Sequence, residues 1–172
     1  DNELHTKVFE TYKMALVALL YTELPPLRLD WANFIIVYDK NEVEKDKNYV
    51  LIDQGNRGKM SFILQKYKTS KTHAAKTFYP TDKLRNVIED WVSLNDTGFL
   101  FPTKKGDKSI SENAFGKLIP KVFESTGKKI TLNILRHVWI SANVDHSVLD
   151  NNDALARAMC HTTATQRTYI KV

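Results

Sequence analysis

The most informative side chain in the sequence is an arginine that lies among apolar residues. Arg136 is flanked by Leu132, Leu135 and Trp139, so a helix here would carry the guanidinium on a partly buried face. Burying a guanidinium is costly unless an anion or a carboxylate pairs with it, and no carboxylate lies within one turn on this segment. A phosphate would satisfy its planar array of donors. Arg136 therefore indicates a phosphate-binding site.

Other residues suited to phosphate or proton chemistry occur in a defined order along the chain. Arg28 follows a double proline, and Lys68 lies at the hinge between two strand-like segments. His137 shares the apolar segment of the arginine described above, His161 begins a polar turn, and Tyr169 follows eight residues later. Taken singly, each has a structural explanation, such as a surface ion pair, a packed histidine or a helix cap. Their combination and order favour a catalytic site.

Helices are predicted in the first half of the chain by apolar periodicity and by capping residues. Val8–Tyr21 has an amphipathic pattern, and Pro25-Pro26 ends it. Pro80-Thr81-Asp82 has the composition of a helix start. The apolar stripe of that second helix consists of Leu84, Val87, Ile88, Trp91 and Val92.

The second half of the chain is predicted to be helical as well. Ser109 or Ser111 could cap a helix that runs to about Ser125, with Gly127 as its stop signal. Thr131 could cap the next helix, whose apolar residues are Leu132, Leu135, Val138 and Trp139. A polar break at Asp145–Asp153 leads to a short helix that ends near Cys160, and the last helical turns reach Tyr169.

A small sheet is predicted between the first two helices. Asp39–Asn48 is polar and is expected to be an exposed loop, Gly55–Gly58 has turn composition, and Thr69–His73 is a polar hinge. The strand-like segments are Tyr49–Asp53, Met60–Tyr67 and Lys76–Tyr79. Together these elements predict a mainly α fold with one small antiparallel β-sheet, an α+β class.

Length and composition predict one domain with a modest positive charge. The chain has 172 residues, 42% of them hydrophobic, and a formal charge of +5, which fits a polyanionic partner without requiring one. Cys160 is the only cysteine, so no intrachain disulfide forms and an intracellular protein is expected. No apolar run is long enough to cross a bilayer, so no membrane partner is expected. The chain starts at Asp1, and a further N-terminal domain is expected to be missing.

The acidic residues do not form the sequence pattern of a metal-dependent nuclease. Many such enzymes place Asp or Glu two residues before Lys, and none of the twenty acidic residues here has Lys at that position. No zinc-type Cys/His cluster occurs either. We therefore expect no metal and no cofactor, although carboxylates that are distant in sequence could still converge.

Four segments resemble the catalytic boxes of tyrosine recombinases and phage-type integrases, and together they cover nearly the whole chain. The segment TLNILRHVWIS (131–141) resembles the second arginine box, whose pattern is HxxRH followed by apolar residues. The closing box with the nucleophilic tyrosine is similar to ALARAMCHTTATQRTYIKV (154–172). The first arginine box resembles LYTELPPLRLDW (20–31), and the hairpin with the catalytic lysine resembles QKYKTSKT (65–72). The two C-terminal boxes are the most specific.

The resemblance implies a site-specific recombinase that cleaves and rejoins DNA through a 3′-phosphotyrosyl intermediate. Tyr169 would be the nucleophile, and Lys68 would protonate the leaving 5′-hydroxyl. Arg28 and Arg136 would bind the non-bridging oxygens, with His161 as a further donor. The rival candidates for the lysine are Lys66, Lys71 and Lys76.

Three positions depart from the family pattern. Asn133 stands where the box has its first histidine, and an amide can donate to a phosphate but cannot carry a proton in acid–base chemistry. Cys160 replaces the usual glycine before His161, and the interval from His161 to Tyr169 is about one residue shorter than the common form. The double-proline form of the first box looks more like recombinases of eukaryotic viruses and mobile elements than like bacterial ones.

The expected partner is double-stranded DNA, on which the resemblance implies a homotetramer; a monomer is plausible off DNA. Backbone contacts are expected from Lys59, Lys66, Lys71, Lys76, Lys104, Lys105 and Lys108. Three alternatives stay open: a type IB topoisomerase with the same catalytic set, a degenerate recombinase that only binds DNA, and an unrelated helical interaction domain. The interpretation for residues 1–172 is a single catalytic domain without the family's N-terminal DNA-binding domain.

Overall fold

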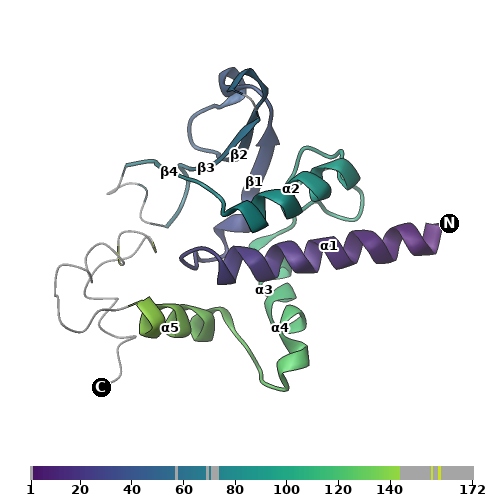
Figure 1. The fold of residues 1–172 in the computed structure, drawn as a ribbon, viewed down its shortest axis with the longest axis vertical. Coiled ribbons are helices and arrows are strands. Elements are labelled where there is room, and N and C mark those ends of the chain that lie inside the picture. Colours follow the sequence, from purple (N-terminus) through teal and green to yellow (C-terminus); the bar gives the residue numbers. More distant parts are fainter. Residues whose placement is uncertain are drawn as a thin grey trace.

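The computed structural model describes residues 2–56, 58–68, 70, 74–143, 156 and 159. The candidate residues His161 and Tyr169 lie outside the described residues, as do Lys71, the polar break at 145–153 and the predicted helix ending near Cys160. The described part is an α+β fold in which the helices pack beside a small sheet that lies at one end (Figure 1). In Figure 1, helix α1 (Asn2–Thr22) crosses the middle of the molecule between the sheet and the last described helix, α5 (Leu132–Asn143).

The long N-terminal helix supplies one wall of the core. Leu16, Val17 and Leu20 on α1 are fully buried, as the predicted amphipathic pattern requires. The helix packs against α2 (Asp82–Leu94) and α4 (Leu118–Val122). A ring contact between Phe9 and Trp91, with centroids 4.5 Å apart, fixes the α1–α2 pair.

The sheet is mixed rather than antiparallel, which corrects the expectation from sequence. Its four strands are β1 (Phe34–Val37), β2 (Asn48–Asp53), β3 (Lys59–Leu64) and β4 (Lys76–Phe78), in the order β1-β2-β3-β4. The three predicted strands pair antiparallel, but β1 pairs parallel with β2. Strand β1 is a four-residue apolar run without alternation, and such runs carry no periodic strand signal.

Both edges of β1 are paired, which explains why so short a strand is stable. On the side away from β2, the amide of Ile36 donates to the carbonyl of Gly98 at 2.7 Å. The amide of Leu100 donates to the carbonyl of Phe34 at 2.9 Å. The loop after α2 therefore closes this side of the sheet, and its backbone groups are satisfied.

Two helix predictions are confirmed at their caps and one needs correction. Thr81 caps α2 through its side chain. Gly127, with a φ of 67°, ends the helical segment that closes at Thr126. The single helix expected up to Ser125 is instead split into α3 (Glu112–Gly116), α4 and a short 3-10 turn at Glu124–Thr126. Pro120 explains the split, because proline cannot donate to the carbonyl four residues earlier, at Gly116.

Helix α5 buries the face that carries Arg136, as the sequence predicts. Arg136 and Ile140 are its buried residues, whereas Val138, one of its apolar residues, is 61% exposed. Leu132 and Leu135 are partly buried and pack against the core. The helix therefore turns its arginine, rather than its full apolar stripe, toward the interior.

An aromatic cluster joins the sheet to the segment that follows Arg28. Trp31 is fully buried, and its ring centroid lies 4.6 Å from that of Phe34, 5.0 Å from Phe62 and 5.9 Å from Phe78. These partners belong to β1, β3 and β4. Because Trp31 lies three residues after Arg28, this cluster ties the chain next to the arginine to the core.

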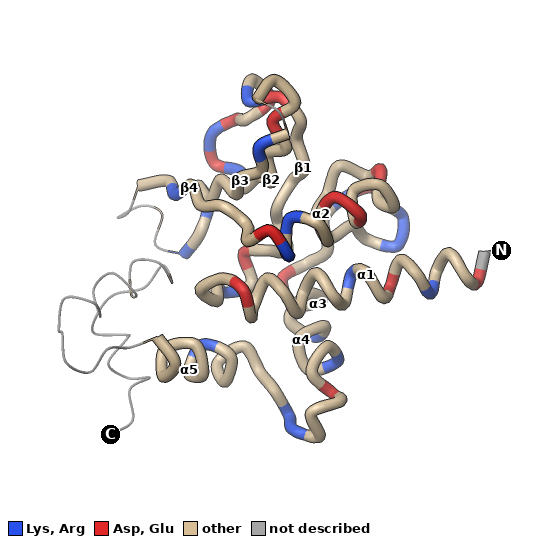
Figure 2. Tube along the Cα trace, in the orientation of Figure 1, with Lys and Arg blue, Asp and Glu red and all other residues tan. Residues whose placement is uncertain are grey.

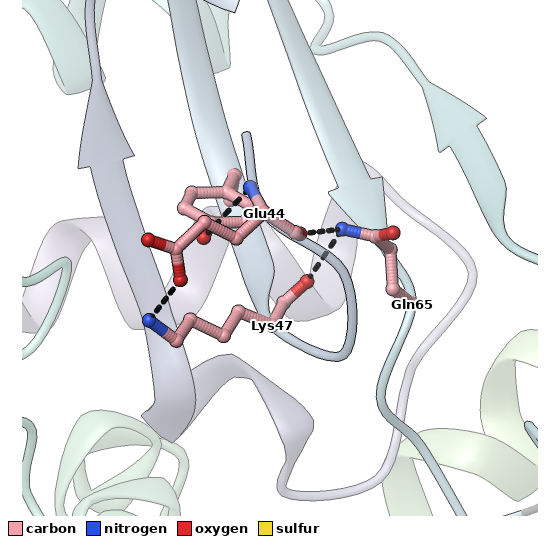
Figure 3. Close-up of polar contacts among 4 residues, drawn as sticks. Glu44, Lys47 and Gln65 are labelled. Atoms are coloured by element: carbon pink, nitrogen blue, oxygen red, sulfur yellow. Dashed lines mark hydrogen bonds and ion pairs between the residues drawn. The ribbon is translucent and has the colours of Figure 1, made fainter. Parts of the chain in front are cut away.

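Strand β3 ends at Leu64, three residues earlier than predicted, because a side chain takes over its backbone bonds. The buried Asn48 accepts from the amides of Gln65 and Lys66, at 2.9 and 2.8 Å, and donates to the carbonyl of Lys66 at 2.8 Å. The Gln65 side chain donates in turn to the carbonyls of Glu44 and Lys47, whose side chains form an ion pair (Figure 3). These bonds fix the chain that leads to Lys68.

We predict that Asn48→Ala destabilises the protein by at least about 2 kcal/mol, because it leaves part-buried backbone groups without partners. Urea unfolding followed by circular dichroism measures the change. Asn41→Ala is the matched control, since Asn41 is exposed and should change stability by less than about 0.5 kcal/mol. Equal effects of the two substitutions would contradict the role assigned to Asn48.

Candidate functional site

Helix α5 delivers Arg136 into the interior, where two backbone carbonyls accept its hydrogen bonds. The side chain is 1% exposed; Nη1 donates to the carbonyl of Pro26 at 2.6 Å, and Nη2 donates to that of Met159 at 3.5 Å. These carbonyls therefore offset part of the desolvation cost of Arg136, which the sequence analysis expected a phosphate to offset. The bonds also connect α5 with the Arg28 segment and with a residue near the C-terminus.

Arg28 follows α1 in a short extended segment and is half-buried. The hydroxyl of Tyr21 on α1 donates to its backbone carbonyl at 2.7 Å. Within the described residues its guanidinium makes no hydrogen bond or ion pair, and its Nε is buried. A half-buried guanidinium in this state is available to bind an anion.

Arg28 and Lys68 line the same cavity, which has a volume of about 670 Å³. Its walls come from the Arg28 segment, β1, the loop before β2, the end of β3, α3 and the first residue of α5. The lining residues of either charge are Arg28, Lys47, Lys66 and Lys68, and Asp30, Asp46 and Glu112. The cavity is thus a site of mixed charge, and not a purely cationic one.

Asp30 is the carboxyl that interacts most directly with Arg28. Burial raises the pKa of Asp30, and the nearby Glu112 raises it further, whereas its own backbone amide and the Arg28 guanidinium lower it. The Glu112 carboxylate accepts a hydrogen bond from Asn33 at 3.4 Å. These acidic groups keep the charge around Arg28 partly compensated.

Both lysines before the hinge of the β3–β4 connection reach the cavity. Lys66 and Lys68 are exposed and line it, so the choice between them stays open, whereas Lys76 lies on β4 and lines a separate apolar cavity. The buried Tyr67 between them donates from its hydroxyl to the carbonyl of Ala74 at 3.0 Å. This bond joins the two ends of the connection next to the lysines.

Asn133 and His137 do not line the cavity, unlike Arg28, Lys66 and Lys68. Asn133 is exposed in the first turn of α5 and does not line the cavity, although the neighbouring Leu132 does. His137 is half-buried and does not line it either. Among the described residues the structure thus brings together Arg28, Lys66 and Lys68, with Arg136 bonded to the Arg28 segment; His161 and Tyr169 lie outside them.

Sequence reasoning missed two residues that build the site, Tyr21 and Asn48. Tyr21 falls on the apolar face of α1 and reads as a core residue. Asn48 precedes a run of strand formers, and its amide is unusual for the start of a buried strand, which was a usable signal. Neither residue offers a motif, because each acts on the backbone of a distant segment.

Basic residues are spread over several surfaces of the described chain. Figure 2 shows basic and acidic positions alternating around the loops of the sheet. A second basic group, Lys121, Lys128 and Lys129, lines a shallow cavity of about 430 Å³ next to α4. None of the described helices is long and apolar enough to cross a membrane, and the described residues contain no group of three or more His, Cys, Asp or Glu that could hold a metal ion.

Comparison with known proteins finds similarity at the level of structure and not of sequence. No protein-family model and no curated protein sequence matches the chain. A solved structure described as the crystal structure of XerA recombinase matches with a TM-score of 0.60 and 13% sequence identity, over 100% of this chain. The matched region spans 57% of that recombinase chain. The chain therefore has a recombinase-like α+β fold.

Proposed function

We propose that this chain is the catalytic domain of a tyrosine recombinase, which cleaves and rejoins double-stranded DNA through a 3′-phosphotyrosyl intermediate. The observation that carries the proposal is the cavity that Arg28 and Lys68 line together, next to the segment that Arg136 binds. These residues come from three of the four segments with family resemblance. The recombinase-like fold supports the same conclusion.

In the proposed reaction the phenolate oxygen of Tyr169 attacks a phosphorus atom of the DNA backbone. The phenol loses its proton to water, a step that neighbouring cations favour. A bond forms between the phenolic oxygen and phosphorus while the bond from phosphorus to the 5′-oxygen breaks. The Lys68 ammonium gives a proton to that oxygen. Rejoining reverses these steps with a new 5′-hydroxyl.

The charged residues have separate roles in this scheme. Arg28 binds the non-bridging oxygens, on which negative charge increases in the transition state, and Arg136 is proposed as the second guanidinium. His161 supplies a further donor, with Asn133 as a weaker one. The phosphotyrosyl ester conserves the bond energy, so the proposed reaction consumes no nucleotide, and the cationic side chains supply the charge stabilisation that a metal gives in other nucleases. A homotetramer on two duplexes is the assembly proposed for strand exchange.

We predict that Tyr169→Phe abolishes covalent protein–DNA adducts while leaving DNA affinity unchanged, because only the nucleophilic oxygen is lost. The substrate is a pool of short nicked duplexes of randomised sequence, from which cleavage releases a small fragment and traps the adduct. DNA retained on denatured protein is measured.

Tyr38→Phe is the matched control, since Tyr38 is 40% exposed and lies at the end of β1. It should form adducts like the wild type. Adducts that persist in Tyr169→Phe would remove that residue as nucleophile. A wild-type chain that binds the duplexes and never forms an adduct would instead identify a DNA-binding domain without catalysis.

We predict that Lys68→Ala slows cleavage of an ordinary phosphodiester by about a hundredfold or more, because the leaving oxygen lacks its proton donor. Replacing the bridging 5′-oxygen by sulfur should restore the rate, since a thiolate leaves without protonation. Single-turnover adduct formation measures both rates. Lys66→Ala is the control from the same cavity. At saturating DNA it should keep the wild-type cleavage rate on the oxygen substrate and on the sulfur substrate, because a lost phosphate contact weakens binding and not the chemical step. Restoration by sulfur in Lys66→Ala alone would assign the general acid to Lys66.

We predict that DNA binding depends on salt through the lysines of the cavity. Lys66→Gln should reduce the slope of log affinity against log salt concentration by about 1, as expected for the loss of one phosphate contact. Fluorescence anisotropy on a labelled duplex measures the slope. Lys121→Gln serves as the control, because Lys121 lines a different cavity. A larger loss from Lys121→Gln would place the DNA on the α4 surface instead.

A further inference from the structure

The segment that carries Arg28 is held by two buried side chains from different helices. The Tyr21 hydroxyl, on α1, donates to the carbonyl of Arg28 at 2.7 Å, and Arg136 on α5 donates to the carbonyl of Pro26 at 2.6 Å. Tyr21 is 2% exposed and Arg136 is 1% exposed. Two successive polar contacts thus fix the backbone on which the arginine sits.

The direction of the Arg28 side chain depends on this backbone. Within the described residues its guanidinium makes no hydrogen bond or ion pair, and its Nε is buried, so no such contact holds the guanidinium directly. The Tyr21 bond ends on the carbonyl of Arg28 itself and therefore sets the orientation of that peptide plane. Without this anchor the Arg28 backbone could shift, and a shift of its Cα–Cβ bond would carry the guanidinium away from the cavity that it lines.

We propose that Tyr21 is a positioning residue for DNA cleavage, whose buried hydroxyl holds the Arg28 peptide so that the guanidinium faces the phosphate. The inference rests on the proposed function. It adds a residue that the family resemblance does not include among the catalytic residues. Tyr21 touches no reacting atom in this scheme and acts through Arg28 alone.

Two properties of Tyr21 suit it to this role. Burial raises the pKa of its phenol, and the Asp30 carboxylate raises it further while Arg136 lowers it, so the hydroxyl keeps its proton at neutral pH. The ring also packs in the core, with its centroid 6.3 Å from that of Phe115. Phenylalanine at this position keeps the ring contact and removes only the donor.

The first experiment measures the environment of the Arg28 guanidinium in the absence of DNA. Nitrogen-15 NMR of the arginine Nε–H groups should show the Arg28 signal shifted or broadened in Tyr21→Phe, with Arg28→Lys identifying the signal. Arg85 is an internal reference, because its Nε is likewise buried without a hydrogen-bond partner in the described chain. Its signal should stay unchanged. An unchanged Arg28 signal would overturn the proposal whether or not the chain cleaves DNA.

The second experiment measures single-turnover adduct formation on the nicked duplex pool. Tyr21→Phe should slow the step about ten- to a hundredfold, as displacement of a catalytic group does, with DNA affinity unchanged. In an Arg28→Ala background the same substitution should change the rate by less than about twofold, because no guanidinium remains to be placed. Tyr12→Phe on the same helix, whose hydroxyl donates to Asp90 at 3.4 Å, should leave the rate unchanged.

The outcomes separate this inference from the proposed function. An equal loss from Tyr21→Phe in both backgrounds would indicate general destabilisation and overturn the positioning role. A wild-type chain that forms no adduct would overturn the proposed function, while the NMR measurement would still decide whether Tyr21 orients Arg28. Loss of DNA affinity together with rate would also contradict the proposal, since positioning predicts an effect on the chemical step.

Discussion

The hydrogen bond from Arg136 to the carbonyl of Pro26 is the contact on which the site depends. It joins residues 110 positions apart, and it does so between buried groups. An unmet guanidinium in the interior would cost several kcal/mol, and the carbonyl acceptors offset part of that cost. The same bond fixes the approach of α5 to the segment that ends in Arg28. The need to pair the buried Arg136 guanidinium therefore constrains the position of α5 relative to the Arg28 segment.

The mixed charge of the cavity limits what it binds well. Asp30 interacts electrostatically with Arg28, and Glu112 adds a second carboxyl to the cavity, so part of the arginine's positive charge is compensated. Loosely held anions gain little in such a site. A phosphate gains most when it meets the planar donors of the guanidinium directly, because hydrogen bonds to a fixed fork depend on orientation. The site therefore selects an anion by the geometry of its hydrogen bonds to the guanidinium more than by its net charge.

Local signals in the sequence predicted the helix ends, and long-range contacts explain where prediction failed. Thr81 and Gly127 act within one turn of backbone, so their capping roles follow from residue type alone. Strand β1 was missed because its stability comes from neighbours on both edges. Arg136 was recognised as buried and polar, but its carbonyl partner at Pro26 could not be deduced, since a 110-residue separation leaves no local pattern. His161 and Tyr169 remain predictions from the family pattern.

Two classes of polar side chain divide the work in the described site. Tyr21, Asn48 and Arg136 are buried, and each binds backbone groups of a segment that leads to a candidate residue. Arg28 and Lys68, in contrast, line the cavity, and among the described residues their side chains form no hydrogen bond to a backbone group. Because the buried class fixes the backbone in advance, a ligand need not reorganise the chain to meet the cations. Under the proposed function, the transition-state charge would therefore meet cations whose backbone is already held in place.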